Sequence, residues 1–468
     1  MPRIQALAVA STLGASLAAL AQTCTPSFHP GEPGATGISD PFSAYAQPMT
    51  LFQGDLIVGG AFSSAGGLAT NCIAAFDPAT NAWSRLGGGA NLGSTNGFGA
   101  ALATFTLNGT PHLIFGGSFA SMLTGGGVPV PNTTSLAAWD GTQWTTLTTN
   151  WQPATGRSVW TLLDWQPTPG DHRLLAGGGF PSIGAATAAG VAYFDGEGWN
   201  NVGGTTDTGV AGSFSPSVFC SAVYNGNLYI GGRFDSVSGV AAPNIAFWNG
   251  AAWQRPGFLS NGGAISDVSS LCVFDDGSGP KLYAGGYTLS VAGQAATVAR
   301  FDGVSWAAVG QNLGGRGTAL AVFDDGTGAK LYMGMTADAS QHYIYRLEST
   351  TWVVVDGGVS VPISGNFPSV FGLFAAPGTL YVGGNFQQAG TQTAHGVAAY
   401  AGCPPTCGSA DFNGDGDVGT DQDILDFFSC LAGFCCPTCG SADFNGDGDV
   451  GTDADIEAFF RVLAGGSC

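Results

Sequence analysis

Charged residues are scarce in this chain of 468 residues: they make up 9% of the sequence, and only 12 of them are basic. With a formal net charge of −20, the chain has nothing that would neutralise a row of phosphates, so nucleic acid is not an expected partner. Glutamate occurs four times and histidine five times, at scattered positions. This scarcity leaves few candidates for a paired-carboxylate glycosidase or a local histidine metal pair.

Recognisable catalytic motifs are also missing. The sequence contains no Gly-x-Ser-x-Gly and no His-Glu-x-x-His, which mark a nucleophile elbow and a zinc protease. We therefore assign no catalytic residue. A motif search does not address side chains that the fold brings together from distant segments, so an enzyme stays an alternative.

Long apolar runs are absent beyond the N-terminus, so we expect no transmembrane segment in the mature chain. The chain begins Met-Pro-Arg, continues with an apolar stretch over 4–20, and has a small-residue Ala-Leu-Ala site at 19–21. This order predicts a secretory signal peptide, residues 1–21, cleaved after about Ala21. We expect a secreted protein, outside the cell or in the cell envelope.

Glycine, by contrast, is abundant at 77 residues, while 44% hydrophobic content argues against disorder. A strand ending in Gly-Gly recurs seven times at intervals of about 49–61 residues, with one decayed copy. The seven copies lie at 56–62, 113–119, 174–180, 228–234, 282–287, 331–335 and 380–386.

Each copy has the same companions. An apolar strand precedes it, and a hairpin with Asp-Gly or Asn-Gly between aromatic residues follows it, as in Phe194-Asp-Gly-Glu-Gly-Trp199. Four short strands per copy predict a mainly β fold, a seven-bladed β-propeller over residues 22–402. The seventh copy lacks its Trp strand, and residues 25–32 have the missing pattern, so we expect the N-terminal strand to complete blade seven.

The Gly-Gly, aromatic-turn and Trp pattern resembles the kelch-like propellers and is similar to the propeller repeats of cortical cell-polarity marker proteins. That resemblance implies a blade architecture, with the glycines and tryptophans as packing residues, and it implies no particular chemistry. Asp-Asp-Gly at 275–277 and 324–326 looks like a fragment of a calcium loop, but its place between paired strands favours hairpin turns.

Loops are the expected binding surfaces of such a propeller. The unusual ones are 120–135 and 151–172, and the second contains three tryptophans beside polar residues. These are Trp151, Arg157, Trp160, Trp165, Asp171 and His172. Exposed tryptophan suits sugar stacking or a protein contact, whereas partly buried tryptophan within an insertion is the plainer interpretation.

The C-terminal segment, 403–468, contains the same fifteen residues twice, from Cys407 and from Cys439. Oxygen-bearing side chains alternate along each copy, and Gly416 and Gly448 permit a sharp turn. This spacing wraps hard oxygen ligands around one cation per copy, so we predict two Ca²⁺ ions. The first-copy ligands are Asp411, Asn413, Asp415 and Asp417, and those of the second are Asp443, Asn445, Asp447 and Asp449.

For the ligand that closes each loop, the sequence offers two alternative residues. An acidic residue is expected at the twelfth loop position, where Gln422 and Ala454 stand. Aspartates flank that position on both sides, so a shift by one residue would supply the ligand. The candidates are Asp421 or Asp423 in the first copy, and Asp453 or Asp455 in the second.

An amphipathic helix is predicted after each loop. Its apolar residues are Ile424, Phe427, Phe428 and Leu431, then Ile456, Phe459, Phe460 and Leu463. The duplicated loop-plus-helix unit resembles the dockerin family of calcium-binding modules, which implies a cohesin-like protein as the partner of this segment. The closing position departs from that family's pattern.

Eleven cysteines in an exported chain favour disulfides over metal thiolates. The repeat boundaries suggest Cys407–Cys436 and Cys439–Cys468, and Cys220 and Cys272 stand at similar places in adjacent repeats and are a third candidate pair.

The sequence thus predicts a non-catalytic binding or scaffold protein. The propeller would be its interaction platform, for a protein or carbohydrate ligand, and the calcium-ordered C-terminal segment its attachment module. The alternative is a propeller-borne carbohydrate-active enzyme that the same segment docks into an extracellular complex.

Overall fold

The computed structural model describes residues 26–29, 37–40, 44–92, 97–147, 157–257, 266–336, 342–361, 368–402, 408–436, 438–445 and 451–464. The predicted signal peptide, residues 1–21, lies outside these ranges. None of the helices in the described ranges is long and apolar enough to cross a membrane.

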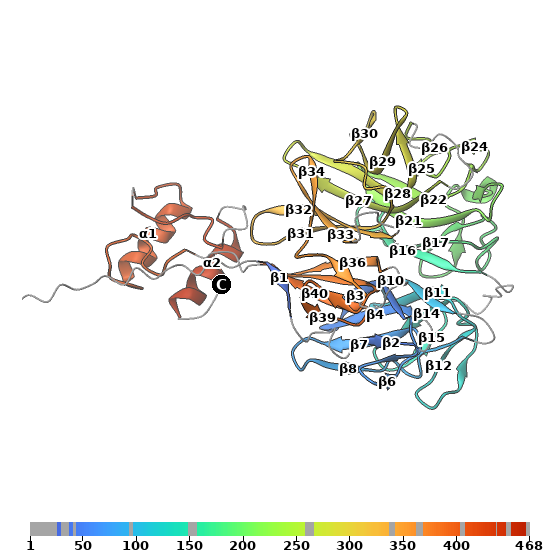
Figure 1. Ribbon diagram of the computed structural model, residues 1–468, viewed down its shortest axis with the longest axis horizontal. Helices are drawn as coiled ribbons and strands as arrows, with labels where there is room; N and C mark the ends of the chain where they lie inside the picture. The colour runs from blue at the N-terminus through green and yellow to red at the C-terminus, as the bar shows by residue number, and fades with distance from the viewer. Residues whose placement is uncertain are drawn as a thin grey trace, which may run out of the picture.

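The described residues form seven four-stranded antiparallel sheets, the blades of a β-propeller (Figure 1). The innermost strands, from blade 1 to blade 7, are β3 (Tyr45–Phe52), β10 (Phe98–Leu107), β16 (Val159–Trp165), β21 (Ser217–Tyr224), β27 (Asp267–Asp275), β31 (Arg316–Asp324) and β36 (Ser369–Ala376). The second strands are β4 (Asp55–Ala61), β11 (Thr110–Ser118), β17 (Arg173–Gly178), β22 (Asn227–Arg233), β28 (Pro280–Val291), β32 (Ala329–Thr336) and β37 (Thr379–Asn385).

The third strands, in the same order, are β7 (Ile73–Asp77), β14 (Leu136–Trp139), β18 (Val191–Phe194), β25 (Ile245–Trp248), β29 (Gln294–Phe301), β33 (Ile344–Glu348) and β40 (Val397–Ala401). The outermost strands are β8 (Ala82–Ser84), β15 (Trp144–Thr145), β19 (Trp199–Asn200), β26 (Trp253–Gln254), β30 (Trp306–Ala308), β34 (Thr351–Val354) and β1 (Ser27–Phe28). Each innermost strand contacts the next, and β36 contacts β3, so the ring closes.

All seven innermost strands carry a β-bulge at an equivalent position. The second strand lies very close there: a Cβ added to Gly117 would stand 2.1 Å from the carbonyl oxygen of Phe98. This close approach explains the second glycine of each pair, because a side chain would collide with the bulged strand. The first glycine faces the next blade, where a Cβ on Gly116 would stand 2.8 Å from the side chain of Val159. The residues left out of the pairing, here named the bulge residues, are Gln47 with Pro48, Ala100, Trp160, Phe219, Ser269, Thr318 and Phe371.

The tryptophans of the outermost strands bind neighbouring blades together. In four blades the indole N–H donates to the exit segment of the preceding blade, at distances of 2.6–3.1 Å. The donor and acceptor pairs are Trp144 with Leu86, Trp253 with Asp207, Trp306 with Pro256, and Trp352 with Val309.

Short three-stranded sheets add a second connection between blades, since an exit strand of one blade pairs with a loop of the next. They are β2 (Ile38–Ser39) with β5 (Ser64–Ala65) and β6 (Leu68–Ala69), and β9 (Ala90–Asn91) with β12 (Ser121–Leu123) and β13 (Pro129–Val130). The others are β20 (Val210–Ala211) with β23 (Ser236–Val237) and β24 (Val240–Ala241), and β35 (Val359–Ser360) with β38 (Gln388–Ala389) and β39 (Gln392–Thr393). A single 3₁₀ turn, η1 (Gly204–Thr206), precedes β20 in this part of the chain.

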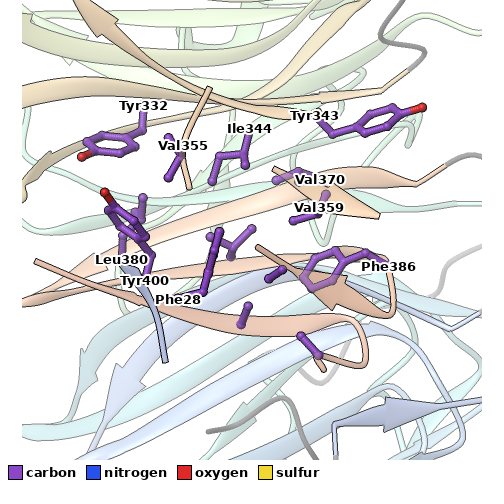
Figure 2. Packing of buried hydrophobic residues seen from close by; sticks show 14 of the residues in the cluster. Phe28, Tyr332, Tyr343, Ile344, Val355, Val359, Val370, Leu380, Phe386 and Tyr400 are labelled. Atoms are coloured by element: carbon purple, nitrogen blue, oxygen red, sulfur yellow. The ribbon is translucent and has the colours of Figure 1, made fainter. Parts of the chain in front are cut away.

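The outermost strand of blade 7 is β1, from the N-terminal end of the described chain. It pairs antiparallel with β40, Phe28 opposite Tyr400. Figure 2 shows Phe28 beside Tyr400 in the cluster of buried residues that joins blades 6 and 7. The Phe28 N–H donates to Asp356 of the blade 6 exit segment at 2.8 Å, so β1 is held by both blades.

The cysteine pairings differ from those predicted. The structure joins Cys430 to Cys435 and Cys436 to Cys439. The predicted Cys407–Cys436 and Cys439–Cys468 bonds are therefore wrong, because a turn between the two copies brings Cys436 and Cys439 to each other.

The predicted Cys220–Cys272 bond is also wrong, since both cysteines are free. They lie on neighbouring inner strands but not at equivalent places: Cys220 directly follows its bulge residue, as Ser270 does, and Cys272 is two residues farther along.

Removing the ring of Phe28 should weaken the closure of the propeller. We expect Phe28→Ala to lower the free energy of unfolding by roughly 3 kcal/mol, because a fully buried ring is lost. Urea denaturation followed by circular dichroism would measure this, with His29→Ala, an exposed neighbour on the same segment, as the control. Equal midpoints for the two variants, or an unchanged melting temperature after deletion of residues 22–34, would contradict the role given to β1.

Candidate functional site

The C-terminal module contains two helices, α1 (Asp421–Leu431) and α2 (Asp453–Leu463), which Figure 1 shows apart from the sheets of the propeller. Phe427 and Phe459 stack at its centre with their ring centroids 4.0 Å apart. Phe412 and Phe444, from the two loops, pack edge-on against this pair. These loop aromatics were missed by the sequence analysis, although each stands at the second position of its loop.

The module has an approximate two-fold arrangement. The N–H of Gly408 donates to the carbonyl of Phe444, and the N–H of Gly440 donates to that of Phe412, at 2.9 and 2.8 Å. Each loop therefore holds the other. The predicted apolar stripe on the helices is only partly buried, because Phe428 and Phe460 are 42% and 44% exposed.

The first loop folds its oxygen atoms over its own backbone. The Gly416 N–H donates to Oδ2 of Asp411 at 3.1 Å, the Asp415 N–H to Oδ1 of Asn413 at 3.0 Å, and the Asp417 N–H to Oδ1 of Asp415 at 2.8 Å. The remaining oxygen of Asp411, Oδ1, is buried and accepts no hydrogen bond from the described residues. Such an atom is costly unless a donor or a cation satisfies it.

Asp423 and Asp455 have a structural role at the helix starts. Asp423 accepts the N–H groups of Phe412, Asn413 and Thr420 and the Thr420 hydroxyl. Asp455 does the same with the equivalent residues of the second copy. Burial opposes ionisation of both carboxyls, but these donors outweigh it and lower the pKa of each. Each aspartate completes a capping box.

The two loops differ in one supporting residue that sequence reasoning missed. Asp426, on α1, accepts from the Asn413 side-chain amide at 3.1 Å and from Gln422 at 3.0 Å, so Asn413 keeps its oxygen toward the loop. The equivalent residue in the second copy is Ala458. Aligning the two copies could have identified this residue, because their loops have the same sequence whereas their helices differ at this position.

The carboxylates of the first loop are not gathered at one point in this conformation. Across the ranges that the structure describes, no three His, Cys, Asp or Glu side chains form a metal-binding group. Asp421 and Asp453 lie exposed in the first turns of their helices. Asp443 and Asn445 are described, whereas Asp447 and Asp449 lie outside the described residues.

The two Asp-Asp-Gly sequences are hairpin turns, between β27 and β28 and between β31 and β32. The second turn is centred on Asp325, which is fully buried and accepts from Arg346 at 2.7 Å and from the Tyr332 hydroxyl at 3.0 Å. Asp276 binds Arg300 and Lys281 in the same way in blade 5 but is partly exposed. In each turn the second aspartate is thus paired with cations of the protein, and the first, Asp275 or Asp324, accepts backbone N–H groups of the turn.

The tryptophan-rich segment 151–172 divides between buried and accessible positions. Trp165 is 3% exposed and belongs to the core, so the suggestion that it is an exposed stacking residue is wrong. Trp160 is a bulge residue and is partly exposed. Asp171 pairs with Arg173, and His172 with Asp164, each at 2.7 Å, while Trp151 lies outside the described residues.

No protein-family model and no curated protein matches the chain. Among solved structures it is similar to the extracellular domain of BT4673 from B. thetaiotaomicron, with 10% identity and a TM-score of 0.46 over 84% of this chain. It is also similar to an ancestral GH74 enzyme, with 11% identity and a TM-score of 0.45 over 80% of this chain. The chain spans 42% of the first structure and 51% of the second.

A third similar structure is virginiamycin B lyase from Staphylococcus aureus, with 11% identity and a TM-score of 0.40. That match covers 78% of this chain and 97% of the lyase. None of these similarities supports an argument about ligand or chemistry, so the resemblances to kelch-like propellers and to dockerins stay predictions.

The buried Asp325 cluster makes stability depend on acid pH. Burial tends to raise the pKa of Asp325, but hydrogen bonds from Thr327 and Tyr332 and the charge of Lys330 outweigh it and lower the pKa. A lowered folded-state pKa stabilises the protein above the unfolded value, about 3.9, and this stabilisation is lost as pH falls through the folded value. We expect Asp325→Asn to cost roughly 3 kcal/mol at neutral pH, because Arg346 and Lys330, which are mostly buried, lose the buried carboxylate that they share and keep only Glu348 as an acidic partner.

Urea denaturation between pH 2 and pH 7 would test this expectation, and Asp276→Asn, the partly exposed equivalent, is the matched control. The Asp325→Asn protein should lose less stability than the wild type on acidification, and the control should cost less at neutral pH. Equal losses in both variants at pH 7 would contradict the importance given to burial.

Proposed function

We propose that this chain is an exported, non-catalytic binding or scaffold protein. Its propeller serves as an interaction platform, and its C-terminal module, ordered by two Ca²⁺ ions, serves as the attachment point. The observation that carries the calcium assignment is the buried Oδ1 of Asp411, which has no donor among the described residues. A hard cation would satisfy this atom.

The rest of the first loop fits the same ion. Asn413 and Asp415 supply oxygen atoms at alternate positions, and Gly416 makes the turn with a φ of 94°. Asp423 already accepts four hydrogen bonds, so Asp421 is the better candidate for the closing ligand, and by sequence identity Asp453 is the candidate in the second loop. Bound calcium would add the charge that draws these carboxylates together.

An aromatic pair on the module supports its role in attachment. Phe428 and Phe460, one from each helix, lie with ring centroids 6.2 Å apart and stay partly exposed, and Leu425 is 60% exposed on α1. Exposed aromatic side chains of this kind are typical of protein contacts. The partner that fits is a protein of cohesin-like type with an apolar surface, bound by a module that calcium holds rigid.

Calorimetric titration of the mature chain, residues 22–468, should detect two calcium sites. For an extracellular module, dissociation constants on the order of 10⁻⁴ to 10⁻³ M are expected. Asp411→Ala and Asp443→Ala should each remove one site, whereas Glu457→Ala, an acidic residue of α2 paired with Arg461, should keep both. Absence of binding heat in oxidised, metal-stripped protein would refute the calcium assignment.

Attachment should require both calcium and the aromatic pair. We expect the immobilised mature chain to capture one protein from the secreted or envelope fraction of its source in calcium, and to release it in chelator. Replacing both Phe428 and Phe460 by Ser should abolish capture, since the apolar contact is removed. Quantitative mass spectrometry of the captured proteins would measure this.

The matched control is Phe434→Ser, because Phe434 is 80% exposed in the same module but lies beyond α1. Capture that persists in chelator, or that the Phe434 variant loses equally, would argue against attachment through the helix pair.

A further inference from the structure

A cavity of about 320 Å³ lies where the innermost strands begin, on the axis of the propeller. Six bulge residues from six different blades line it: Gln47, Trp160, Phe219, Ser269, Thr318 and Phe371. Each of the six is partly exposed, although the residue on at least one side of it is buried. The bulges therefore turn these side chains out of the sheets and into one accessible space, with a volume in the range of small-ligand sites.

Aromatic rings form one wall of this cavity. Trp160 packs against Phe98 with ring centroids 4.8 Å apart and against Phe219 at 5.8 Å. On the adjoining side Tyr45 packs against Phe371 at 5.0 Å. The rings support one another, so the wall is preorganised for a flat, partly apolar ligand.

The opposite side of the cavity carries an excess of positive charge. Asp267, which is fully buried, accepts from Arg316 at 2.8 Å and from Arg233 at 3.1 Å. One carboxylate thus faces two guanidinium groups, and about a third of each arginine side chain is exposed. The three charges sum to +1, and Arg316 itself lines the cavity.

The aromatic wall, the hydroxyls of Ser269 and Thr318, and the spare guanidinium charge together define a ligand class. We propose that the channel mouth binds an anionic carbohydrate, a sugar bearing a carboxylate. The C–H face of the sugar ring lies on Trp160 and its neighbours, and the carboxylate takes the donors that Arg316 has left after binding Asp267.

The excess charge distinguishes this ligand from a neutral sugar. A neutral sugar would use the aromatic wall and the hydroxyls but would leave the net charge of +1 on these three residues uncompensated. This inference deepens the proposed binding role of the propeller, on which it rests, but it does not require calcium.

Calorimetry with tri-galacturonate as the probe tests the proposal on the mature chain, in chelator and in 0.15 M salt. The matched probe is the methyl ester of the same trisaccharide, which keeps the sugar rings and removes the charge. We expect tri-galacturonate to bind, and its ester to bind at least tenfold more weakly, because a charge-assisted hydrogen bond is lost.

Two variants and a control locate the site. Trp160→Ala and Arg316→Gln should each weaken binding of tri-galacturonate at least tenfold, whereas Arg85→Gln, an exposed arginine outside the cavity, should leave it unchanged. Arg316→Gln leaves Asp267 paired with Arg233, so this variant keeps the test decisive even if Trp160→Ala fails to fold.

Three results would overturn the proposal: no binding of tri-galacturonate to the wild type, equal binding of the ester, or undiminished binding by folded Arg316→Gln. Because chelator is present throughout, a failure here leaves the calcium-dependent attachment to be decided by its own titration. In the same way, a failure to detect calcium binding in that titration would not affect the result for tri-galacturonate binding in the channel.

Discussion

The propeller depends on the close approach between the first two strands of each blade. Where the inner strand bulges, its carbonyl oxygen occupies the space that a side chain on the second strand would need, 2.1 Å from a Cβ on Gly117 and equally near one on Gly232. Glycine is the residue that permits this approach. The same bulge turns one residue of the inner strand toward the axis. The same bulge therefore determines both how the blade packs and which residue lines the channel. Blades built in this way can vary the residue that faces the axis while they keep their glycines.

Neighbouring blades are connected by a small set of recurring contacts. Two of the exit segments that pair with the next blade also receive an indole N–H. Leu86, before β9, accepts from Trp144, and Asp207, before β20, accepts from Trp253. In blade 7 the N-terminal strand has no tryptophan, and Phe28 takes the equivalent place against Tyr400. The backbone N–H of Phe28 then supplies the bond to the preceding blade, through Asp356. Closure thus uses the same two contacts as the four junctions with an indole hydrogen bond, a buried ring and one hydrogen bond.

Much of this architecture could be predicted from the sequence, because the turns and the glycines are local signals. Seven copies of Gly-Gly indicated seven blades, and the blade with Met335 in place of the second glycine proves to have Gly317 opposite it. Contacts between residues far apart in the sequence were harder to predict. The cysteines were assigned from their approximate positions in the repeats, but the equivalent bulges of the two inner strands align Cys220 with Ser270, two residues before Cys272. The channel wall was not predicted, although Trp160, Phe219 and Phe371 each follow Ser-Val in the sequence. That short pattern does not show the bulge that turns these rings out of the sheets, which only the strand pairing reveals.

The two proposed binding regions carry opposite charge, and this separation has a physical consequence. Twelve of the 32 acidic side chains lie beyond residue 402, and only one of the 12 basic ones does. The net charge of −20 repels an anion at a distance, but at physiological salt that repulsion is screened over about 8 Å. Within the channel mouth the excess guanidinium charge acts at contact distance, where screening is weaker. An anionic ligand would thus meet little long-range repulsion and be held by local contacts, which makes affinity there depend on Arg316 and the aromatic wall rather than on the charge of the whole chain.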